Sequence, residues 1–231
     1  MSEQGQSQPG EMGFPAYGQS AGEPAQGFGG AIFFPHRIVL ASSSPARKKL
    51  LESMGLEFEC DAPEIDETPK PGEDPKELAE RLALAKADAA RERHPDAFVI
   101  GCDQVGLIES EEGEITLLDK PGDPERALAQ LEMMSGKTVE FRDALAIRQP
   151  DGRLLRGFAL SVVSMRKYTR DEAEAYLRMD PEAVRCCGSC RFEGLGRWLI
   201  DSAVSADHDA LVGLPTLELV RLMLIAGARL L

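Results

Sequence analysis

Residues 37–51 read RIVLASSSPARKKLL and set how the folded part of the chain begins. The apolar run Ile38-Val39-Leu40 predicts a short buried strand. Ser44 is a preferred N-cap residue, and Pro45 suits the first helical position because the amide hydrogen that proline lacks has no partner there. The stretch therefore predicts a strand that turns directly into a helix.

The serines of this stretch lie on the predicted strand-to-helix turn. Free backbone N–H groups and the positive end of the helix dipole meet at such a turn, and the hydroxyls of Ser42 and Ser43 can add donors. Arg47, in the first turn of the helix, can bind an oxyanion through two N–H groups. These features indicate a phosphate site. The alternative, which this stretch alone favours, is that Ser44 only caps a surface helix whose basic residues face the solvent.

The composition is that of a globular protein. Its 231 residues, 43% of them hydrophobic, can bury a substantial core. A net charge of −13 argues against a nucleic acid or an anionic membrane as partner, because both require a broad basic surface, whereas a cleft with a few cations could hold a small phosphorylated ligand. No apolar run approaches the roughly 20 residues of a membrane span, and the N-terminus lacks a secretory signal, so we expect a cytoplasmic protein.

Five cysteines are an odd number in a chain too large to need disulfides, and reduced thiols are expected. Cys187 and Cys190 form a C-x-x-C pair, which could be a redox pair or half of a zinc site. No second pair or nearby histidine completes four ligands. Ordinary buried cysteines are therefore the favoured interpretation.

The chain divides into a tail and one body. Residues 1–34 are rich in Gly, Gln, Pro and Ser without periodicity, which predicts a disordered tail. Over residues 35–231 strand and helix patterns alternate without a second linker, which predicts a single mixed α/β domain. The predicted strands are 38–40, 56–60, 97–101, 137–148 and 153–166, with a hairpin at 109–114, and the predicted helices begin at Pro45, Pro75, Pro124, after Thr169 and at Pro215.

Acidic residues lie at two places that suit a ligand. Glu64, Asp66 and Glu67 are in a proline-bearing loop and could bind a hard divalent cation or simply cover a solvated turn. Asp103 directly follows a buried strand, where α/β proteins place ligand-contacting groups, and Val105 beside it indicates apolar surroundings. The pattern favours a functional role for Asp103 and leaves the loop acids open.

Seven motifs connect these segments in a fixed order. They are ASSSPARKKLL, EIDETP, L-A-x-x-K-A at residues 82–87, GCDQV, KPG, SGK and LVGLP. Through them the chain, from Arg37 to its end, resembles the Maf-like nucleotide pyrophosphatase family. Gln104 after Asp103, and Glu193 where other members carry Gln, make it most similar to the 7-methyl-GTP pyrophosphatase subgroup.

This resemblance implies an α/β fold of the Maf/ITPase type, in which a long twisted mixed sheet has flanking helices and a nucleotide cleft lies between two lobes. It implies hydrolysis of a nucleoside triphosphate, in this subgroup 7-methyl-GTP, to the monophosphate and pyrophosphate. A divalent cation, Mg²⁺ or Mn²⁺, would assist, and the protein would be a homodimer. The alternative is a nucleotide-binding regulator of septum formation without significant catalysis, because family members are tied to septum arrest.

The resemblance also implies roles for single residues. Asp103 would be the general base or a metal ligand, Glu64 a further metal ligand, and Glu67 a structural residue. Gln104 and Glu193 would read the base, because acceptors suit the N–H donors of guanine and a carboxylate favours the positive charge of 7-methylguanine. The phosphates would be held by Ser42, Arg47, Lys86 and Lys120.

The chain departs from the family's motifs at three places. Ala46, a specificity position, stands where the subgroups carry Trp or Arg. Asp119 replaces the glycine before Lys120-Pro121 and could either repel phosphate or be neutralised by a local partner. Asp143-Ala144 replaces the usual Thr-Gly.

Overall fold

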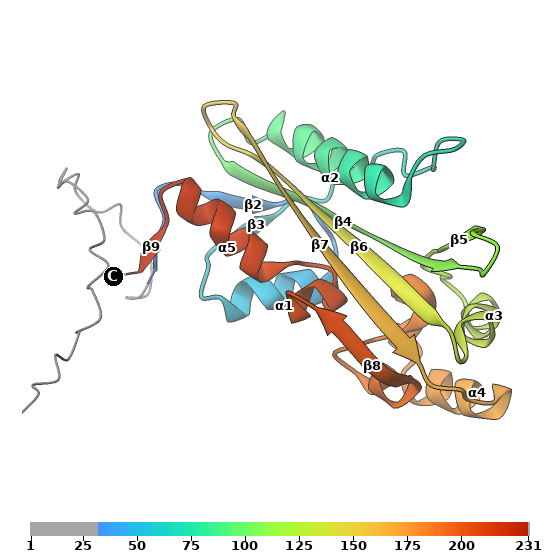
Figure 1. Ribbon diagram of the computed structural model, residues 1–231. Helices are drawn as coiled ribbons and strands as arrows, with labels where there is room; N and C mark the ends of the chain where they lie inside the picture. Colours follow the sequence, from blue (N-terminus) through green and yellow to red (C-terminus); the bar gives the residue numbers. More distant parts are fainter. Residues whose placement is uncertain (1–31, 231) are drawn as a thin grey trace, which may run out of the picture.

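The computed structural model describes residues 32–230 (Figure 1). The tail predicted over residues 1–34 therefore lies almost entirely outside the described residues. At its end, β1 (Ile32–Phe33) pairs antiparallel with β9 (Arg229–Leu230). Phe34 is buried with its ring against Phe98. Residues 32–34 are thus part of the folded body.

Three long strands, β4, β6 and β7, form the centre of the sheet and cross the molecule diagonally in Figure 1. The strand order is β3-β2-β4-β6-β7-β8, with β5 paired to the far part of β4. β2 is parallel to both β3 and β4, whereas all other pairs are antiparallel. The strands are β2 (Ile38–Leu40), β3 (Glu59–Cys60), β4 (Phe98–Glu109), β5 (Ile115–Leu118), β6 (Thr138–Arg148), β7 (Leu154–Met165) and β8 (Ile200–Ser205).

Four of the five predicted helix starts are confirmed, because their signals are local, whereas the last helix begins at Thr216 with Pro215 as its N-cap. Ser44, Asp74 and Asp123 each accept a hydrogen bond from a backbone N–H of the first turn, and a proline follows each of them. The helices are α1 (Pro45–Ser53), α2 (Pro75–Arg91), α3 (Pro124–Met134), α4 (Arg170–Met179) and α5 (Thr216–Ile225). Short 3₁₀ helices, η1 (Pro181–Arg185), η2 (Cys187–Ser189), η3 (Leu195–Leu199) and η4 (His208–Val212), complete the body.

Helix α2 packs tightly against β4 and β6, and α1 and α5 lie on the other side of the sheet (Figure 1). Gly101 permits the close approach of α2, since a Cβ atom at this position would lie 2.1 Å from the carbonyl oxygen of Ala83. This contact fixes where α2 stands relative to the middle of β4, two residues before Asp103.

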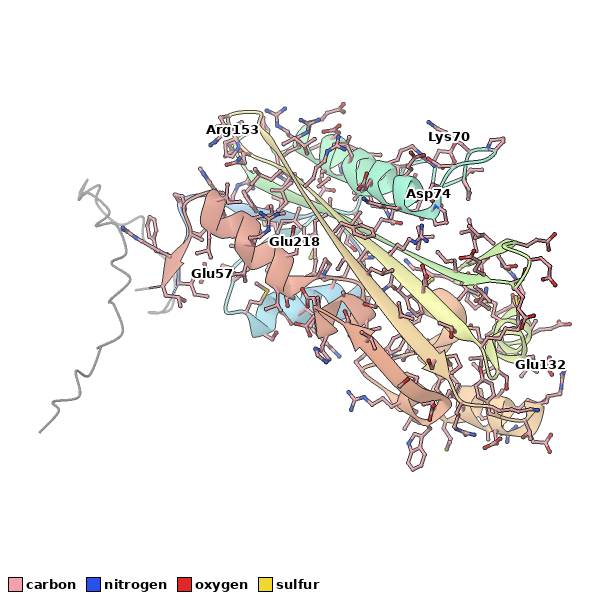
Figure 2. The ribbon with its side chains drawn as sticks, viewed as in Figure 1. Glu57, Lys70, Asp74, Glu132, Arg153 and Glu218 are labelled. Carbon is pink, nitrogen blue, oxygen red and sulfur yellow. The ribbon has the colours of Figure 1, made fainter. Side chains whose placement is uncertain are left out.

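Two apolar cores lie toward opposite ends of the long strands. One contains Leu51, Leu145 and Leu219 and joins α1 and α5 to the sheet. The other contains Leu131 and Phe141 and joins α3, α4 and the 3₁₀ helices to it. Figure 2 labels Arg153 at the hairpin end and Glu132, on α3, at the opposite end. The predicted mixed α/β fold with a long sheet and flanking helices is confirmed.

The boundaries differ from the prediction in three places. β4 continues to Glu109 rather than ending at Gly101, because its apolar residues keep packing past the acidic position. β3 is only two residues long. β8 was not predicted, since its side chains are mostly exposed and give no alternation of apolar and polar residues.

Candidate active site

An ion pair between α2 and β4 forms the centre of the site. Lys86 Nζ lies 2.5 Å from Oδ1 of Asp103 and 2.7 Å from Oε1 of Glu67. Burial alone would lower the pKa of Lys86, but the two carboxylates outweigh it and raise this pKa. The Asp103 Oδ2 and Glu67 Oε2 atoms have no hydrogen-bond partner within residues 32–230. One charged lysine therefore orients two carboxylates, each with one free oxygen.

Arg47 is buried beside this pair and is held from three sides. Its Nε donates to the carbonyl of Gly213 at 2.6 Å, and its Nη1 donates to Ser42 Oγ and to the carbonyl of Cys102. Burial opposes the charge, whereas nearby acids, Asp103 among them, favour it, and the pKa of Arg47 is raised. These contacts leave Nη2 as the free end. The guanidinium therefore mainly holds the neighbouring backbone in place, and only Nη2 remains for the predicted contact with an oxyanion.

Gly213 allows this bracing through its backbone. It has φ 97°, in the left-handed region, and an added Cβ atom would lie 3.3 Å from Arg47 Nε. A side chain at this position would therefore strain the backbone and press on the guanidinium. The LVGLP motif thus supplies a carbonyl to the site.

The serine turn has the predicted geometry. Ser42 is buried, and its Oγ accepts a hydrogen bond from the backbone N–H of Ser44 at 3.2 Å. Ser44 Oγ accepts from the N–H of Arg47 at 3.4 Å. Backbone and hydroxyl groups therefore fix the turn at the N-terminus of α1, where the helix dipole favours an anion.

Gln104 and Asp143 lie opposite each other on β4 and β6, next to Arg47. Gln104 Nε2 donates to the carbonyl of Ala210 at 2.9 Å. Asp143 is 0% exposed, and neither of its carboxyl oxygens has a hydrogen-bond partner within the described chain. Burial raises the pKa of Asp143 well above its usual value, although Arg47 and Gln104 favour the charged form.

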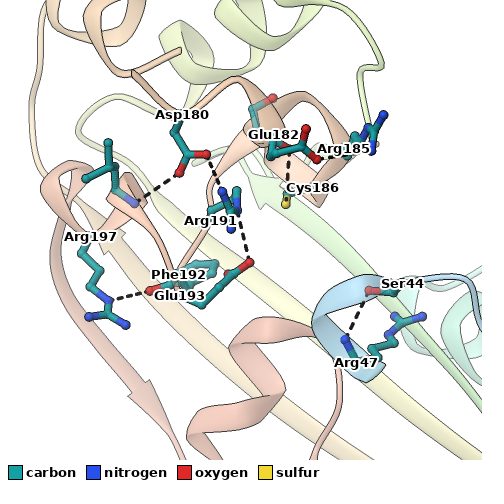
Figure 3. Close-up of polar contacts among 12 residues, drawn as sticks. Ser44, Arg47, Asp180, Glu182, Arg185, Cys186, Arg191, Phe192, Glu193 and Arg197 are labelled. Atoms are coloured by element: carbon teal, nitrogen blue, oxygen red, sulfur yellow. Dashed lines mark hydrogen bonds and ion pairs between the residues drawn. The ribbon is translucent and has the colours of Figure 1, made fainter. Parts of the chain in front are cut away.

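A cleft of about 770 Å³ opens between α1 and the segment that carries Glu193. Figure 3 shows Ser44 and Arg47 on one side and Glu193 with its neighbours on the other. Arg191 holds Glu193 at 3.2 Å and is itself held by the buried Asp180 at 2.5 Å. A smaller adjoining cavity of about 60 Å³ brings together Ala46, Arg47, Gln104, Lys120 and Glu193.

The position of Asp119 settles one of the alternatives raised by the sequence. Its carboxylate pairs with Arg126 and with Gln130, both on α3. Asp119 is therefore neutralised by local partners, and Lys120 beside it is exposed and lines the smaller cavity.

Most of the predicted site residues come together, with one exception. Ser42, Arg47 and Asp103 are linked through the hydrogen bonds and the neighbouring backbone described above, and Lys86 is joined to Asp103. Glu64 is exposed and has no hydrogen bond or salt bridge to the rest of residues 32–230. Glu67, predicted to be structural, is the loop acid that reaches Lys86.

The sequence did not single out two residues of the site, Glu67 and Asp143. Glu67 could not be distinguished from Glu64 and Asp66, because three nearby acids in one loop look alike until the loop is folded. Asp143 carried a signal in the sequence, a single acidic residue within the apolar strand FRDALAI. Such a residue is rarely placed in a buried strand without a partner or a function.

The C-x-x-C pair is not arranged as a reactive dithiol. Cys187 Sγ donates to the carbonyl of Leu118 at 3.3 Å, and Cys190 Sγ donates to the carbonyl of Gly196 at 3.7 Å. Burial raises the pKa of each thiol to about 12. Both are thus buried cysteines that bond separate carbonyls, as the favoured interpretation predicted.

Two features are absent from residues 32–230. No group of three or more His, Cys, Asp or Glu side chains is arranged there to hold a metal ion. None of the helices in this range combines the length and apolar character required to cross a bilayer.

A mixed sheet with a serine turn, a buried cationic centre and an adjoining cleft suits a protein that binds a small anionic ligand. The sequence profile described as "Maf-like protein" matches residues 37–225. The chain therefore belongs to the Maf family, as the resemblance indicated.

Several relatives match nearly their full length. A protein of Xanthomonas axonopodis pv. citri named 7-methyl-GTP pyrophosphatase is 45% identical over 191 residues, which cover 83% of this chain and 97% of the relative. Relatives with the same name from Polaromonas and Chromobacterium violaceum are 44% and 39% identical, over 84% and 80% of this chain and 86% and 94% of their own. A crystal structure of a nucleoside-triphosphatase (dITP/XTP pyrophosphatase) from Mycobacterium abscessus aligns with a TM-score of 0.36 at 20% identity, over 56% of this chain and 74% of that chain, a likeness too weak to add to the argument.

Proposed function

We propose that the protein hydrolyses 7-methyl-GTP, or a closely related nucleoside triphosphate, to the monophosphate and pyrophosphate. Family membership and the name shared by its relatives support this proposal. The observation that carries it is the position of Asp103, a buried carboxylate that is oriented by Lys86, has one free oxygen and stands beside Arg47.

In the proposed reaction Asp103 is the general base. It takes a proton from a water molecule, whose oxygen bonds to the α-phosphorus while the bond from that phosphorus to the bridging α–β oxygen breaks. The electron pair of the broken bond stays on the pyrophosphate. Lys120 and the free end of Arg47 offset the negative charge that develops there, and the serine turn holds the phosphate oxygens.

A divalent cation fits the acidic groups of this centre. Asp103 Oδ2 and Glu67 Oε2 are carboxylate oxygens without a partner in the described chain. Mg²⁺ is commonly held by one or two carboxylates together with substrate phosphates and waters, and Mn²⁺ suits the same oxygen donors. When bound, the cation supplies positive charge at the phosphates and makes the attacking water more acidic. We propose Asp103 and Glu67 as its protein ligands in place of the predicted Glu64.

The base is read in the cavity that Gln104, Glu193 and Ala46 line. Glu193 presents a carboxylate that Arg191 holds in place, which suits the N–H donors and the positive charge of 7-methylguanine. Ala46 leaves space there that a Trp or Arg side chain would fill. We propose that this space admits the methylated purine.

The test is pyrophosphate release from 7-methyl-GTP, GTP, UTP, dTTP and CTP with Mg²⁺ or Mn²⁺. We expect a preference for 7-methyl-GTP, and a loss of turnover of about 100-fold or more in the Asp103→Asn variant, which keeps the shape of the side chain but removes the base. Equal turnover by this variant would refute the role of Asp103. Tight nucleotide binding without any pyrophosphate would support the regulator of septum formation instead.

We also propose that the protein works in the cytoplasm as a homodimer, as the family resemblance implies. Helix α5 carries exposed apolar side chains, with Leu217 64%, Leu224 56% and Ile225 55% exposed. A second copy that covered this face would remove them from water. Light scattering should give the mass of a dimer, and Leu224→Glu should give a monomer. A monomeric wild-type protein at the same concentration would contradict the proposal.

A further inference from the structure

Asp143 lies where the two apolar cores meet. Along β6, the alternate residues Phe141, Asp143 and Leu145 share one face of the strand. Phe141 belongs to the core around α3 and α4, and Leu145 belongs to the core around α1 and α5. Asp143 is fully buried between them. A carboxyl group there interrupts an otherwise continuous apolar face.

Neither carboxyl oxygen of Asp143 has a hydrogen bond of ordinary geometry within residues 32–230, although the Gln104 side chain lies close enough to favour its charged form. A buried polar group without a hydrogen bond destabilises the folded protein by roughly 1–3 kcal/mol. Its presence therefore calls for an explanation, such as a role in function. Arg47 is close, but its Nε and Nη1 already donate to Gly213, Ser42 and Cys102. Gln104 is directly opposite on β4 and also favours the charged form of Asp143, whereas the acids Asp103 and Asp207 oppose it.

The amide of Gln104 has a fixed orientation. Its Nε2 donates to the backbone carbonyl of Ala210, and only the nitrogen end of the amide can do so. The second N–H of this nitrogen remains for another acceptor. The Oε1 atom has no hydrogen-bond partner within residues 32–230, and Gln104 lines the small cavity together with Glu193.

We propose that Asp143 is a positioning residue for base recognition, which holds the NH₂ end of Gln104 inward together with the Ala210 carbonyl so that Oε1 faces the cavity. Oε1 then offers an acceptor to an N–H donor of a purine edge, beside the carboxylate of Glu193. Two adjacent acceptors match the neighbouring N1–H and N2–H₂ donors of guanine. Asp143 can fill this role whether charged or protonated, because both forms keep an acceptor oxygen. The inference rests on the proposed function, since it assigns the base that the same site takes.

The test is a comparison of two ligands that the protein cannot cleave at the α–β bond. The α,β-methylene analogue of 7-methyl-GTP uses the base cavity, whereas inorganic pyrophosphate has no base. Their dissociation constants are measured by calorimetry with Mg²⁺. We expect Asp143→Leu to raise the dissociation constant of the analogue by about 10-fold, which corresponds to the loss of one hydrogen bond. The dissociation constant of pyrophosphate should change by less than about 2-fold. Asp143→Asn, which keeps an acceptor oxygen, should restore analogue binding.

A double-mutant cycle separates positioning from a general structural effect. If Asp143 acts through Gln104, then Asp143→Leu should cause no further loss in a Gln104→Leu protein. Asp143→Ala, which introduces no new atoms, replaces Asp143→Leu if the latter does not fold. Ser161→Ala, at another buried polar position near the sheet centre, is the matched control and should leave both constants unchanged.

Three outcomes would overturn the inference. They are equal weakening of both ligands by Asp143→Leu, additive effects of the Gln104 and Asp143 changes, and failure of the wild-type protein to bind the analogue. Pyrophosphate release is assayed separately with the wild-type protein. A protein that binds the analogue as expected but releases no pyrophosphate would contradict the proposed hydrolysis and leave the positioning role supported.

Discussion

The part of the site proposed to bind phosphate (the phosphate half) and the part proposed to bind the base (the base half) are built differently. In the phosphate half, Arg47, Lys86 and Asp103 are 6%, 8% and 7% exposed and bind one another or the backbone. In the base half, Glu193 is exposed and is oriented by a single arginine, and a cleft of about 770 Å³ adjoins it. Charged groups that are held in place before the ligand arrives can stabilise a transition state. An exposed side chain with few partners, in contrast, can be replaced without disturbing the fold, so that the preference for one base over another can change.

The first prediction concerns the phosphate half and has the largest expected effect. Lys86→Met keeps the length of the side chain but leaves Asp103 as a buried carboxylate without its partner. We expect turnover to fall by about 100-fold or more and the free energy of unfolding to fall by about 3 kcal/mol. Initial rates and urea unfolding measure the two effects.

Lys76→Met is the matched control, since Lys76 lies on the same helix in an exposed pair with Glu80. Surface pairs of this kind contribute little, so both quantities should be nearly unchanged. Equal losses in the two variants would show that the phosphate half is no more organised than the surface of α2.

Much of the fold follows from local signals in the sequence. Ser44-Pro45, Asp74-Pro75 and Asp123-Pro124 each combine a cap with a proline, and each begins a helix as predicted. Strand β8 escaped prediction because its exposed side chains, such as Val204, carry no alternating pattern. A strand that forms only because it pairs with a distant strand cannot be predicted from the residues next to it in the sequence.

The site was predictable to the extent that motifs placed its residues. The motifs assigned Asp103 and Lys86 to the same site. Their 2.5 Å contact could not be predicted, because it depends on the position of α2 over Gly101. The choice between Glu64 and Glu67 depends on the path of a loop. The surroundings of Asp143 are formed by β6, β4 and η4 together. They could not be predicted from any one of these segments.

The second prediction tests how far the phosphate half extends into this loop. Glu67→Gln removes one carboxylate charge next to Lys86, and we expect turnover to fall by about 10-fold, with a higher Mg²⁺ concentration needed for half-maximal rate. Glu64→Gln, its exposed neighbour, should change turnover by less than about 2-fold. Metal titrations of the two variants make the comparison. The opposite ranking would restore Glu64 as the acidic residue of the centre.

The third prediction concerns the base half. Ala46→Trp fills the space beside Glu193, and we expect kcat/KM for 7-methyl-GTP to fall by about 10-fold, because pockets of this kind discriminate by shape over such a range. The affinity for pyrophosphate and the midpoint of thermal unfolding should change little, since Ala46 is partly exposed at the cleft. A comparable loss of pyrophosphate affinity would show that the two halves are not separable.

The fourth prediction concerns the boundary between the halves, where burial raises the pKa of Asp143. Folded Asp143 keeps its proton at pH values at which the unfolded chain, with an Asp pKa near ~3.9, has released it. The stability that this group contributes is therefore present at low pH and decreases as the pH rises above about 4, by at most about 1.4 kcal/mol per pH unit. The Asp143→Asn variant has no proton to lose at this position. Its free energy of unfolding should therefore increase relative to that of the wild-type protein between pH 5 and pH 8. Urea unfolding across this range measures the difference, and parallel pH profiles would show that Asp143 is already ionised in the folded protein over this range.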